Sequence, residues 1–202
     1  MDQHGRWYNM ANIALNKPSG GQLILSPEDG TSTETVTIPS GGVMAADTPT
    51  GKILQIQQSV KVDNSTFSLS NTWQASGLSV SITPTSASSK ILVMYTLQFG
   101  DNGQTAYPGG RLMRNGSVLS GAIATDSVNK QGTSAGGWTG SSSMVQVTGT
   151  QYVDSPATTS TLTYSVDVTG YGGRTFYINH NHGNDANHVA GISTITVMEV
   201  AA

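Results

Sequence analysis

Apolar and polar residues alternate along most of the chain after residue 52, which is the pattern of half-buried β-strands. Residues 162–168 and 78–82 each alternate strictly, and residues 145–147 and 176–179 show shorter versions of the same pattern. A half-buried strand keeps one wet face, as in antiparallel sheets. This alternation therefore predicts several antiparallel strands.

Two further segments complete the strand pattern. Residues 91–99 form an almost continuous apolar run of β-branched and aromatic residues, with Ser and Gly on either side. Their length and flanks predict a buried strand rather than a helix. Near the C-terminus, residues 191–200 alternate. Ile195, Val197 and Glu199 share one face of that predicted strand, and the residues between them share the other.

Turn residues separate these segments. Asn115-Gly116 suits a two-residue hairpin, and the Gly- and Ser-rich stretch Ser127 to Ser143 predicts a long exposed loop, a feature that is often functional. No segment shows sustained helical periodicity. Residues 51–202 thus hold roughly nine or ten predicted strands. We predict an all-β chain in which residues 51–202 form an antiparallel β-sandwich of jelly-roll type.

The first fifty residues have a different organisation. They hold two short strand candidates, residues 22–25 and 34–38, separated by the turn Pro27-Glu28-Asp29-Gly30. Two strands cannot bury a core alone. Residues 1–50 therefore need a partner, which is their own C-terminal domain, copies of the chain, or a larger particle. Because Met10 is a second possible start, residues 1–9 are either an extended arm or an overextended start.

The composition narrows the function classes. The chain has 202 residues, a formal net charge of -3, only 10% charged residues and no cysteine. The lack of cysteine excludes a disulfide scaffold and a cysteine zinc site, and nine scattered Lys and Arg argue against nucleic-acid binding. The N-terminus lacks the pattern of a signal peptide. No apolar stretch approaches eighteen residues, so we expect no membrane insertion.

Two stretches resemble proteins of bacteriophage particles. Residues 23–40 read as a strand, a Pro/Asp/Gly turn and a Thr-Val-Thr-Ile-Pro strand, and this resembles the short β-repeat at the start of many phage tail-fibre and virion proteins. Residues 52–202 resemble a domain frequent in phage structural proteins, similar in layout to the tumour-necrosis-factor-like jelly roll. The segments that carry this second resemblance are residues 78–84, 88–93, 154–160 and 195–200.

This resemblance implies a virion surface protein that is assembled in the host cytoplasm and is usually a homotrimer. Residues 1–50 would attach it to other virion proteins, with Trp7 and Tyr8 either anchoring it there or packing on their own domain. Residues 51–202 would form the head of a short tail fibre or appendage that binds the host surface. The alternative is a trimeric capsid decoration protein, and a third class is a cellular glycan-binding module.

One cluster holds residues that can bind a metal. His180 and His182 would point to the same side of a strand, and three such pairs on a trimer axis would offer the six imidazole nitrogens of an octahedral transition-metal site. Some phage fibre tips are known for a His-x-His iron site of this type. The alternative is a polar loop whose Asn, Asp and Gly serve turns. Calcium at Asn184, Asp185 and Asn187 would have too few carboxylates.

Few aromatic residues lie in the predicted loops. Trp138, Tyr107 and Tyr171 are candidates to stack on a sugar ring of a host-surface glycan, although Trp138 could instead plug a cleft in a trimer. Trp73 precedes a predicted strand, so we expect it in the core. The acidic residues, including Asp154, are mostly isolated in turns and no Gly-x-Ser-x-Gly is present, so we expect no enzyme.

Overall fold

The structure is a computed structural model that describes residues 23–25, 34–36, 51–69, 71–101, 107–125, 132–136, 145–170, 173–182 and 190–202. The chain divides into two compact units, Met1–Thr48 and Pro49–Ala202. In the first unit, β1 (Leu23–Leu25) and β2 (Glu34–Val36) pair antiparallel, so both short strands predicted there are present. None of the described residues forms a helix with the length and apolar character that a membrane crossing needs.

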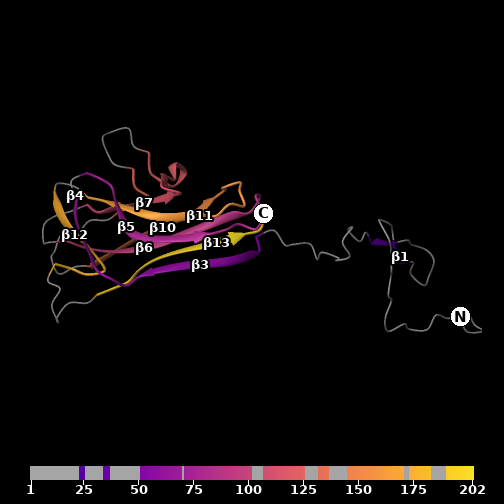
Figure 1. The fold of residues 1–202 in the computed structure, drawn as a ribbon, viewed down its shortest axis with the longest axis horizontal. Helices are drawn as coiled ribbons and strands as arrows, with labels where there is room; N and C mark the ends of the chain where they lie inside the picture. The colour runs from indigo at the N-terminus through magenta and orange to yellow at the C-terminus, as the bar shows by residue number, and fades with distance from the viewer. Residues whose placement is uncertain are drawn as a thin grey trace, which may run out of the picture. The chain divides into compact units, whose positions relative to one another are not determined.

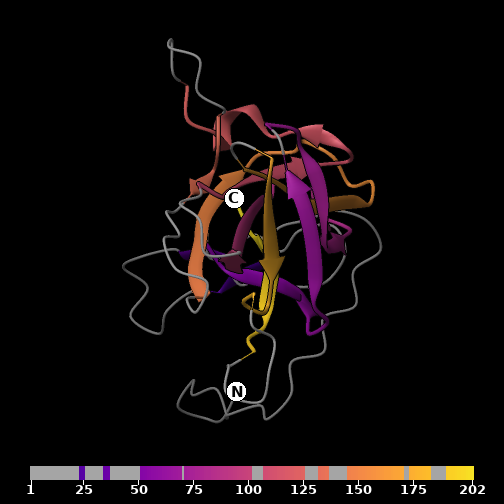
Figure 2. The same ribbon diagram turned by 90° about the vertical axis from the view of Figure 1, so that its left-hand side faces the viewer.

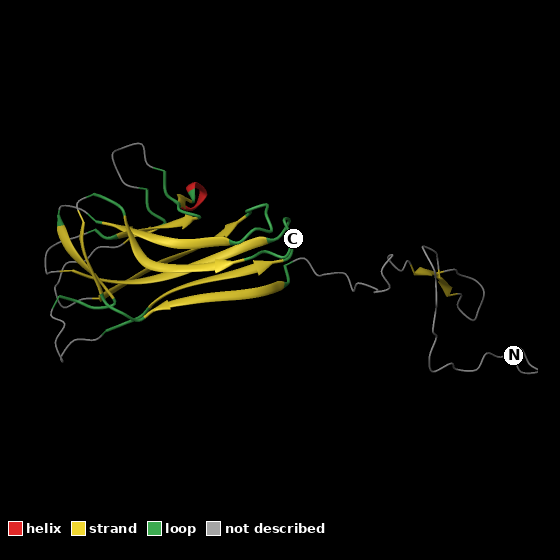
Figure 3. Cartoon of the chain, viewed as in Figure 1, coloured by secondary structure: helices red, strands yellow, loops and turns green. Residues whose placement is uncertain are grey.

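The described part of the second unit consists of strands and loops apart from one 3-10 turn, η1 (Ser120–Ala122). Figure 3 shows these strands stacked in layers. The strands are β3 (Ile53–Lys61), β4 (Ser65–Leu69), β5 (Gln74–Ile82), β6 (Lys90–Asp101), β7 (Gly109–Arg114), β8 (Ser117–Val118), β9 (Ala135–Gly136), β10 (Val145–Asp154), β11 (Leu162–Thr169), β12 (Arg174–Ile178) and β13 (Ser193–Val200).

The strands form two antiparallel sheets (Figure 1). In the first sheet, β6 pairs with β10 along one edge and with β13 and β12 along the other, and β3 and β4 follow outside β13 and β12. The second sheet has the order β5-β11-β7-β8, with β9 beside the start of β7. Successive strands pass repeatedly between the sheets. This arrangement confirms the predicted β-sandwich of jelly-roll type.

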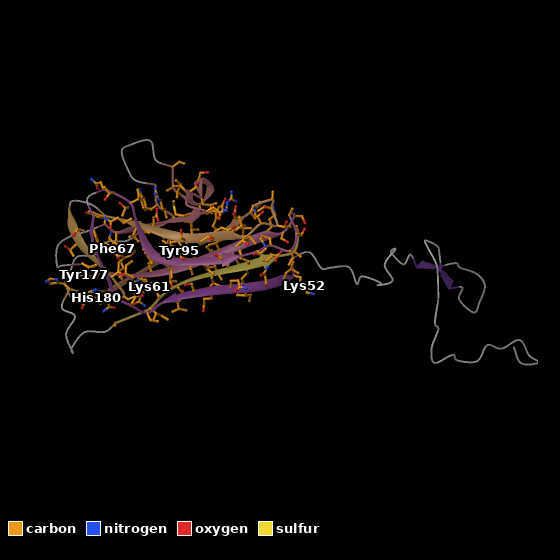
Figure 4. The ribbon with its side chains drawn as sticks, viewed as in Figure 1. Lys52, Lys61, Phe67, Tyr95, Tyr177 and His180 are labelled. Carbon is orange, nitrogen blue, oxygen red and sulfur yellow. The ribbon has the colours of Figure 1, made fainter. Side chains whose placement is uncertain are left out.

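The sandwich has two distinct ends. At the end that we call the base, the chain enters β3 and leaves β13, and backbone hydrogen bonds join Gly51 and Lys52 to Ala201. At the opposite end, which we call the loop end, β3, β6 and β11 finish and β5, β10 and β13 begin. Figure 4 labels Lys52 at the base and Tyr177 and His180 at the loop end, and Figure 2 looks onto the loop end.

The core lies between the sheets and comes from alternate residues of each strand, as the period of two requires. In β13, Ile195, Val197 and Glu199 point inward and are fully buried, as their alternation predicted. The other inward-facing core residues come mainly from β5, β6, β11 and β12: Leu78, Ile82, Ile91, Val93, Tyr95, Leu97, Phe99, Leu162, Tyr164, Val166, Val168, Phe176 and Ile178.

Local backbone chemistry explains the turns. Asn115 and Gly116 both have positive φ, 50° and 76°, and join β7 to β8, which confirms the predicted Asn-Gly hairpin. Gly77, with φ 81°, lies at an irregularity where β5 has extra residues opposite β11. Within the stretch from Ser127 to Ser143, for which a loop was predicted, residues 132–136 are described, and Ala135–Gly136 pairs with β7 as the short strand β9.

Candidate functional site

The predicted sugar-contact and attachment residues lie largely outside the described residues. Trp7, Tyr8, Trp138 and Tyr171 fall outside them. Tyr107 is described and lies just before β7, at the loop end, with 57% of its surface exposed. An exposed ring at this position agrees with a contact role but does not by itself define a binding site.

The histidine pair differs from the expected strand geometry. Strand β12 ends at Ile178, and Asn179 has a left-handed φ of 68°, so His180 and His182 do not continue a strand with a shared side. Instead both rings pack against Tyr177, with ring centroids 4.7 Å and 5.8 Å away. The left-handed residue turns the chain, which breaks the two-residue repeat on which the prediction relied.

Hydrogen bonds fix both imidazole rings through Nδ1. His180 is buried and its Nδ1 lies 2.8 Å from the carbonyl oxygen of Asn181, while His182 is exposed and its Nδ1 lies 2.8 Å from the hydroxyl of Tyr177. A ring held at Nδ1 can present Nε2 to a metal. The described residues bring together no group of three metal-ligating side chains. The metal stays a prediction.

Asn179 holds this corner in place. It is fully buried, and its Nδ2 donates to the carbonyl oxygens of Lys61 and Asp63 at 2.8 Å and 3.0 Å. The hydroxyl of Ser193 donates to its Oδ1 at 2.7 Å. One side chain thus joins the end of β12 to the corner after β3 and to the start of β13.

Trp73 occupies a surface position rather than the expected core position. It is half-buried on the outer side of the second sheet, and the Arg111 guanidinium lies 4.1 Å from its ring centroid. Arg111 also forms an ion pair with Asp167, its cross-strand partner, at 3.1 Å. A short strand can start with an outward residue as readily as an inward one, so periodicity could not place Trp73. The contact between Trp73 and Arg111 depends on the pairing of β7 with β11, which the local sequence does not report.

Two buried carboxylates act within the fold. Asp154, expected as a turn residue, ends β10 and accepts hydrogen bonds from Arg114 at 2.6 Å and from the Tyr164 hydroxyl at 2.7 Å, which ties the two sheets together. Its hydrogen bond raises the pKa of Arg114. Glu199 accepts hydrogen bonds from Gln55 and Thr85. Burial alone would raise the pKa of Glu199, but these bonds outweigh it and lower the pKa to about 2.

The outer face of β3, β13, β6 and β10 is the most distinctive surface of the sandwich. The strand register places Ile56, Met198, Leu92 and Val153 side by side across all four strands. We call these four residues the apolar row, and the whole outer face of these strands the assembly face. Ile56 and Val153 are 53% and 55% exposed, and the two central members are half-buried.

The other outward residues of the assembly face are mostly neutral, and they include further apolar side chains, Val60 and Val147, which are 44% and 61% exposed. The row beside the apolar row holds Gln58, Thr196, Met94 and Gln151 in register. The next row holds Val60, Thr194, Thr96 and Gly149. Among the outward residues of the four described strands, Lys90 at the base carries the only charge, and it donates to the Ser155 hydroxyl at 2.8 Å.

Comparisons with known proteins identify no family for this chain. No protein-family model matches it, and no curated protein matches its sequence. Among solved structures, a chain from the structure of infectious bursal disease virus, Gx strain, is similar with a TM-score of 0.34 and 12% sequence identity. The match covers 92% of this chain and 43% of the viral chain, so this chain spans less than half the length of that one.

Proposed function

We propose that this chain is a non-enzymatic structural protein of a phage virion, which assembles as a homotrimer through the assembly face. Residues 1–50 attach it to other virion proteins, and residues 51–202 form the head on the particle surface. The resemblance of residues 23–40 and 52–202 to phage virion proteins supports the location. The observation that carries the assembly is the apolar row across a sheet face on which Lys90, at the base, is the only charged residue among the described outward side chains.

The sequence of β6 supports a covered face. A nearly continuous apolar strand is typical of a sheet buried on both sides, whereas a sheet with one wet face shows clean alternation. In β6, Val93 and Tyr95 point into the core, but Leu92 and Met94 point outward onto the assembly face. Within one chain these outward residues remain half-buried. A second copy of the chain supplies the missing cover.

The size and polarity of the assembly face suit a contact between copies. Four strands about 4.8 Å apart and about eight residues long give roughly 500 Å² of flat area. A standard interface removes about 800 Å² of accessible surface from each partner, and accessible area exceeds flat area. Apolar residues mixed with neutral Gln and Thr, and with few charges, are typical of the composition of stable interfaces. Three copies around an axis close the assembly and leave no open end.

Three acids that have hydrogen-bond or ion-pair partners within the sandwich support a role without catalysis. Asp154, Asp167 and Glu199 are each held by specific structural partners, and these are Arg114, Arg111 and Gln55, respectively. A hydrolase needs a carboxylate that can exchange a proton with a substrate near neutral pH. The pKa of Glu199, at about 2, is far from that range. We therefore assign the two buried carboxylates, Asp154 and Glu199, to stability.

Within the virion, we propose a short tail fibre or related appendage whose loop end meets the host surface. The base joins the head to residues 1–50, so the loop end is the part of the head farthest along the strands from that attachment. A capsid decoration protein with the same head is the alternative. Imaging of intact particles decides between them, because decoration requires hundreds of copies and a fibre requires a few dozen.

Light scattering tests the assembly directly. A trimer of 21.0 kDa chains has a mass of about 63 kDa. Leu92→Glu and Met198→Glu each place a charge in the apolar row and should give the monomer mass with the fold retained. Ser81→Glu, on the outer face of the other sheet, is the matched control and should stay trimeric. A monomeric wild type at micromolar concentration refutes the assembly, as does a trimer that survives both row substitutions.

A further inference from the structure

The outer face of the second sheet differs chemically from the assembly face because it carries a ladder of hydroxyl groups. Ser79 lies opposite Ser165, and Ser81 lies opposite Thr163, where the two hydroxyl oxygens are 2.9 Å apart. Just beyond the ends of β5 and β11, the hydroxyls of Thr83 and Thr161 are 2.8 Å apart. Of the six hydroxyl residues, Ser165 is half-buried and the other five are exposed.

At its loop end, the hydroxyl ladder borders a cluster formed by Trp73, Arg111 and Asp167. Asp167 lies opposite Arg111 on one side and opposite Ala75 on the other, so all three residues share the outer face with the ladder. Trp73 stacks on Arg111 from the residue just before β5. The side chains of Arg111 and Asp167 keep 19% and 17% of their surface exposed. Aromatic, guanidinium and carboxylate groups therefore border one end of a hydroxyl surface.

We propose that this face binds a neutral polysaccharide. Trp73 contacts the apolar face of one sugar ring, Arg111 and Asp167 bind its hydroxyls, and the hydroxyl ladder contacts the following sugars. From Asp167 to Thr161 the strand extends roughly 20 Å, which is the length of a short oligosaccharide. The proposal extends the proposed function, since it names the surface and the ligand class through which the head contacts a host cell.

The charges favour a neutral ligand over an acidic one. Arg111 and Asp167 neutralise each other, and the described outward residues of β5, β11 and β7 include no further charge. The two hydrogen-bonded pairs, Ser81 with Thr163 and Thr83 with Thr161, each use one donor internally and leave one donor and several lone pairs available, which complements the mixed donors and acceptors of sugars. The exposed part of the Trp73 indole offers an apolar surface beside these polar groups.

The experiment uses the full chain with Trp7→Phe and Trp138→Phe, so that Trp73 is the only tryptophan. Electrophoresis in gels containing dextran, galactomannan or xyloglucan measures retardation by neutral polysaccharides, and Trp73 fluorescence reports contact with the same polymers in solution. We expect retardation by at least one of them, with a change in Trp73 emission. Polygalacturonate, the acidic probe, should bind at least ten-fold more weakly.

Three variants locate the binding surface in the otherwise wild-type chain. Trp73→Ala and Arg111→Gln should each weaken binding roughly ten-fold, whereas Gln58→Ala on the assembly face should leave it unchanged. If Trp73→Ala fails to fold, Arg111→Gln by itself tests the binding surface. The site is refuted if no neutral polysaccharide retards the protein, if polygalacturonate binds best, or if the Trp73 and Arg111 variants bind like wild type. Light scattering on the same samples separates this result from a failure of the trimer.

Discussion

The carboxylate of Glu199 offers a sharp test of how this sandwich is stabilised. Its side chain is fully buried at the base and accepts hydrogen bonds from Gln55 Nε2 at 2.6 Å and from the backbone nitrogen and hydroxyl of Thr85, both at 2.7 Å. These bonds join β3 and β13 to the loop between β5 and β6. The substitution Glu199→Gln keeps the size of the side chain and removes the charge.

The substitution also creates a conflict between donors. The amide of the variant has one oxygen, which accepts, and one NH2 group, which donates. If the oxygen faces Gln55 Nε2, the NH2 group faces the Thr85 nitrogen, and the reverse holds if the amide is turned over. In either orientation two donors meet. Gln55 cannot rotate its amide to resolve this without losing its 2.7 Å bond to the carbonyl oxygen of Thr83. Glu199→Gln therefore loses a charge-assisted hydrogen bond and leaves a buried donor unsatisfied.

The pKa gives the magnitude and the pH range. Folding lowers the pKa of Glu199 from 4.5 to about 2, because the hydrogen bonds outweigh the effect of burial. This difference corresponds to about 3 kcal/mol of the free energy of unfolding. A lowered pKa stabilises the fold fully above pH 4.5, and the contribution is lost as the pH falls toward 2. The side chain of the Glu199→Gln variant does not titrate, so the difference in free energy of unfolding between wild type and variant should shrink over that interval.

Urea unfolding at one protein concentration, at pH 7, 5, 4, 3 and 2.5, measures this effect. We expect Glu199→Gln to be less stable than wild type by about 3 kcal/mol at pH 7 and to approach wild type at pH 2.5. Gln58→Ala is the matched control, since it breaks a neutral 2.8 Å bond to Thr196 between the same two strands. Its deficit should not vary with pH. If the loss of stability in Glu199→Gln is also independent of pH, ionisation of Glu199 does not stabilise the fold.

Three further predictions concern named side chains. Tyr95→Phe should leave the free energy of unfolding unchanged or raise it, because the buried Tyr95 hydroxyl has no hydrogen-bond partner among the described residues. Tyr164→Phe loses the hydrogen bond to Asp154 and should lower the free energy of unfolding by about 1–3 kcal/mol. Urea unfolding compares the two variants, and a larger loss for Tyr95→Phe would contradict the assignment. Asn179→Gly keeps the left-handed φ but loses three hydrogen bonds, and Asn179→Ala adds about 1 kcal/mol of backbone strain, so equal stabilities of the two variants would count against strain at this corner. Elemental analysis of the purified trimer should find iron or zinc that the double variant His180→Ala, His182→Ala lacks, and a metal-free wild type ends that prediction.

Alternation along single strands predicted much of the sandwich correctly. Ile195, Val197 and Glu199 face inward as their spacing required, including the charged residue. The Asn115-Gly116 turn also followed from local chemistry, since both residues tolerate positive φ. These features depend on neighbours close in sequence, and local sequence patterns report such neighbours well.

The candidate sites depended on contacts that local patterns do not report. The histidine pair lost its shared face because of one left-handed residue, Asn179, whose conformation is supported by partners in β3 and β13. The position of Trp73 before a predicted strand favoured the core, but its partner Arg111 lies in another strand and holds the ring on the outer face. Asp154 is isolated in the sequence, but the fold brings Arg114 and Tyr164 within hydrogen-bond distance of its carboxylate.

The sequence by itself determined the all-β class, the inward face of each alternating strand and the neutral character of the surface, because period and composition are properties of the chain alone. Only the tertiary structure decided which outward residues lie together. The apolar row brings together Ile56, Leu92, Val153 and Met198, which are far apart in sequence, through the register of three strand pairs. A shift of one residue in any of those registers would turn a row member toward the opposite face. The register is held by side chains of the whole core, and no single strand encodes it.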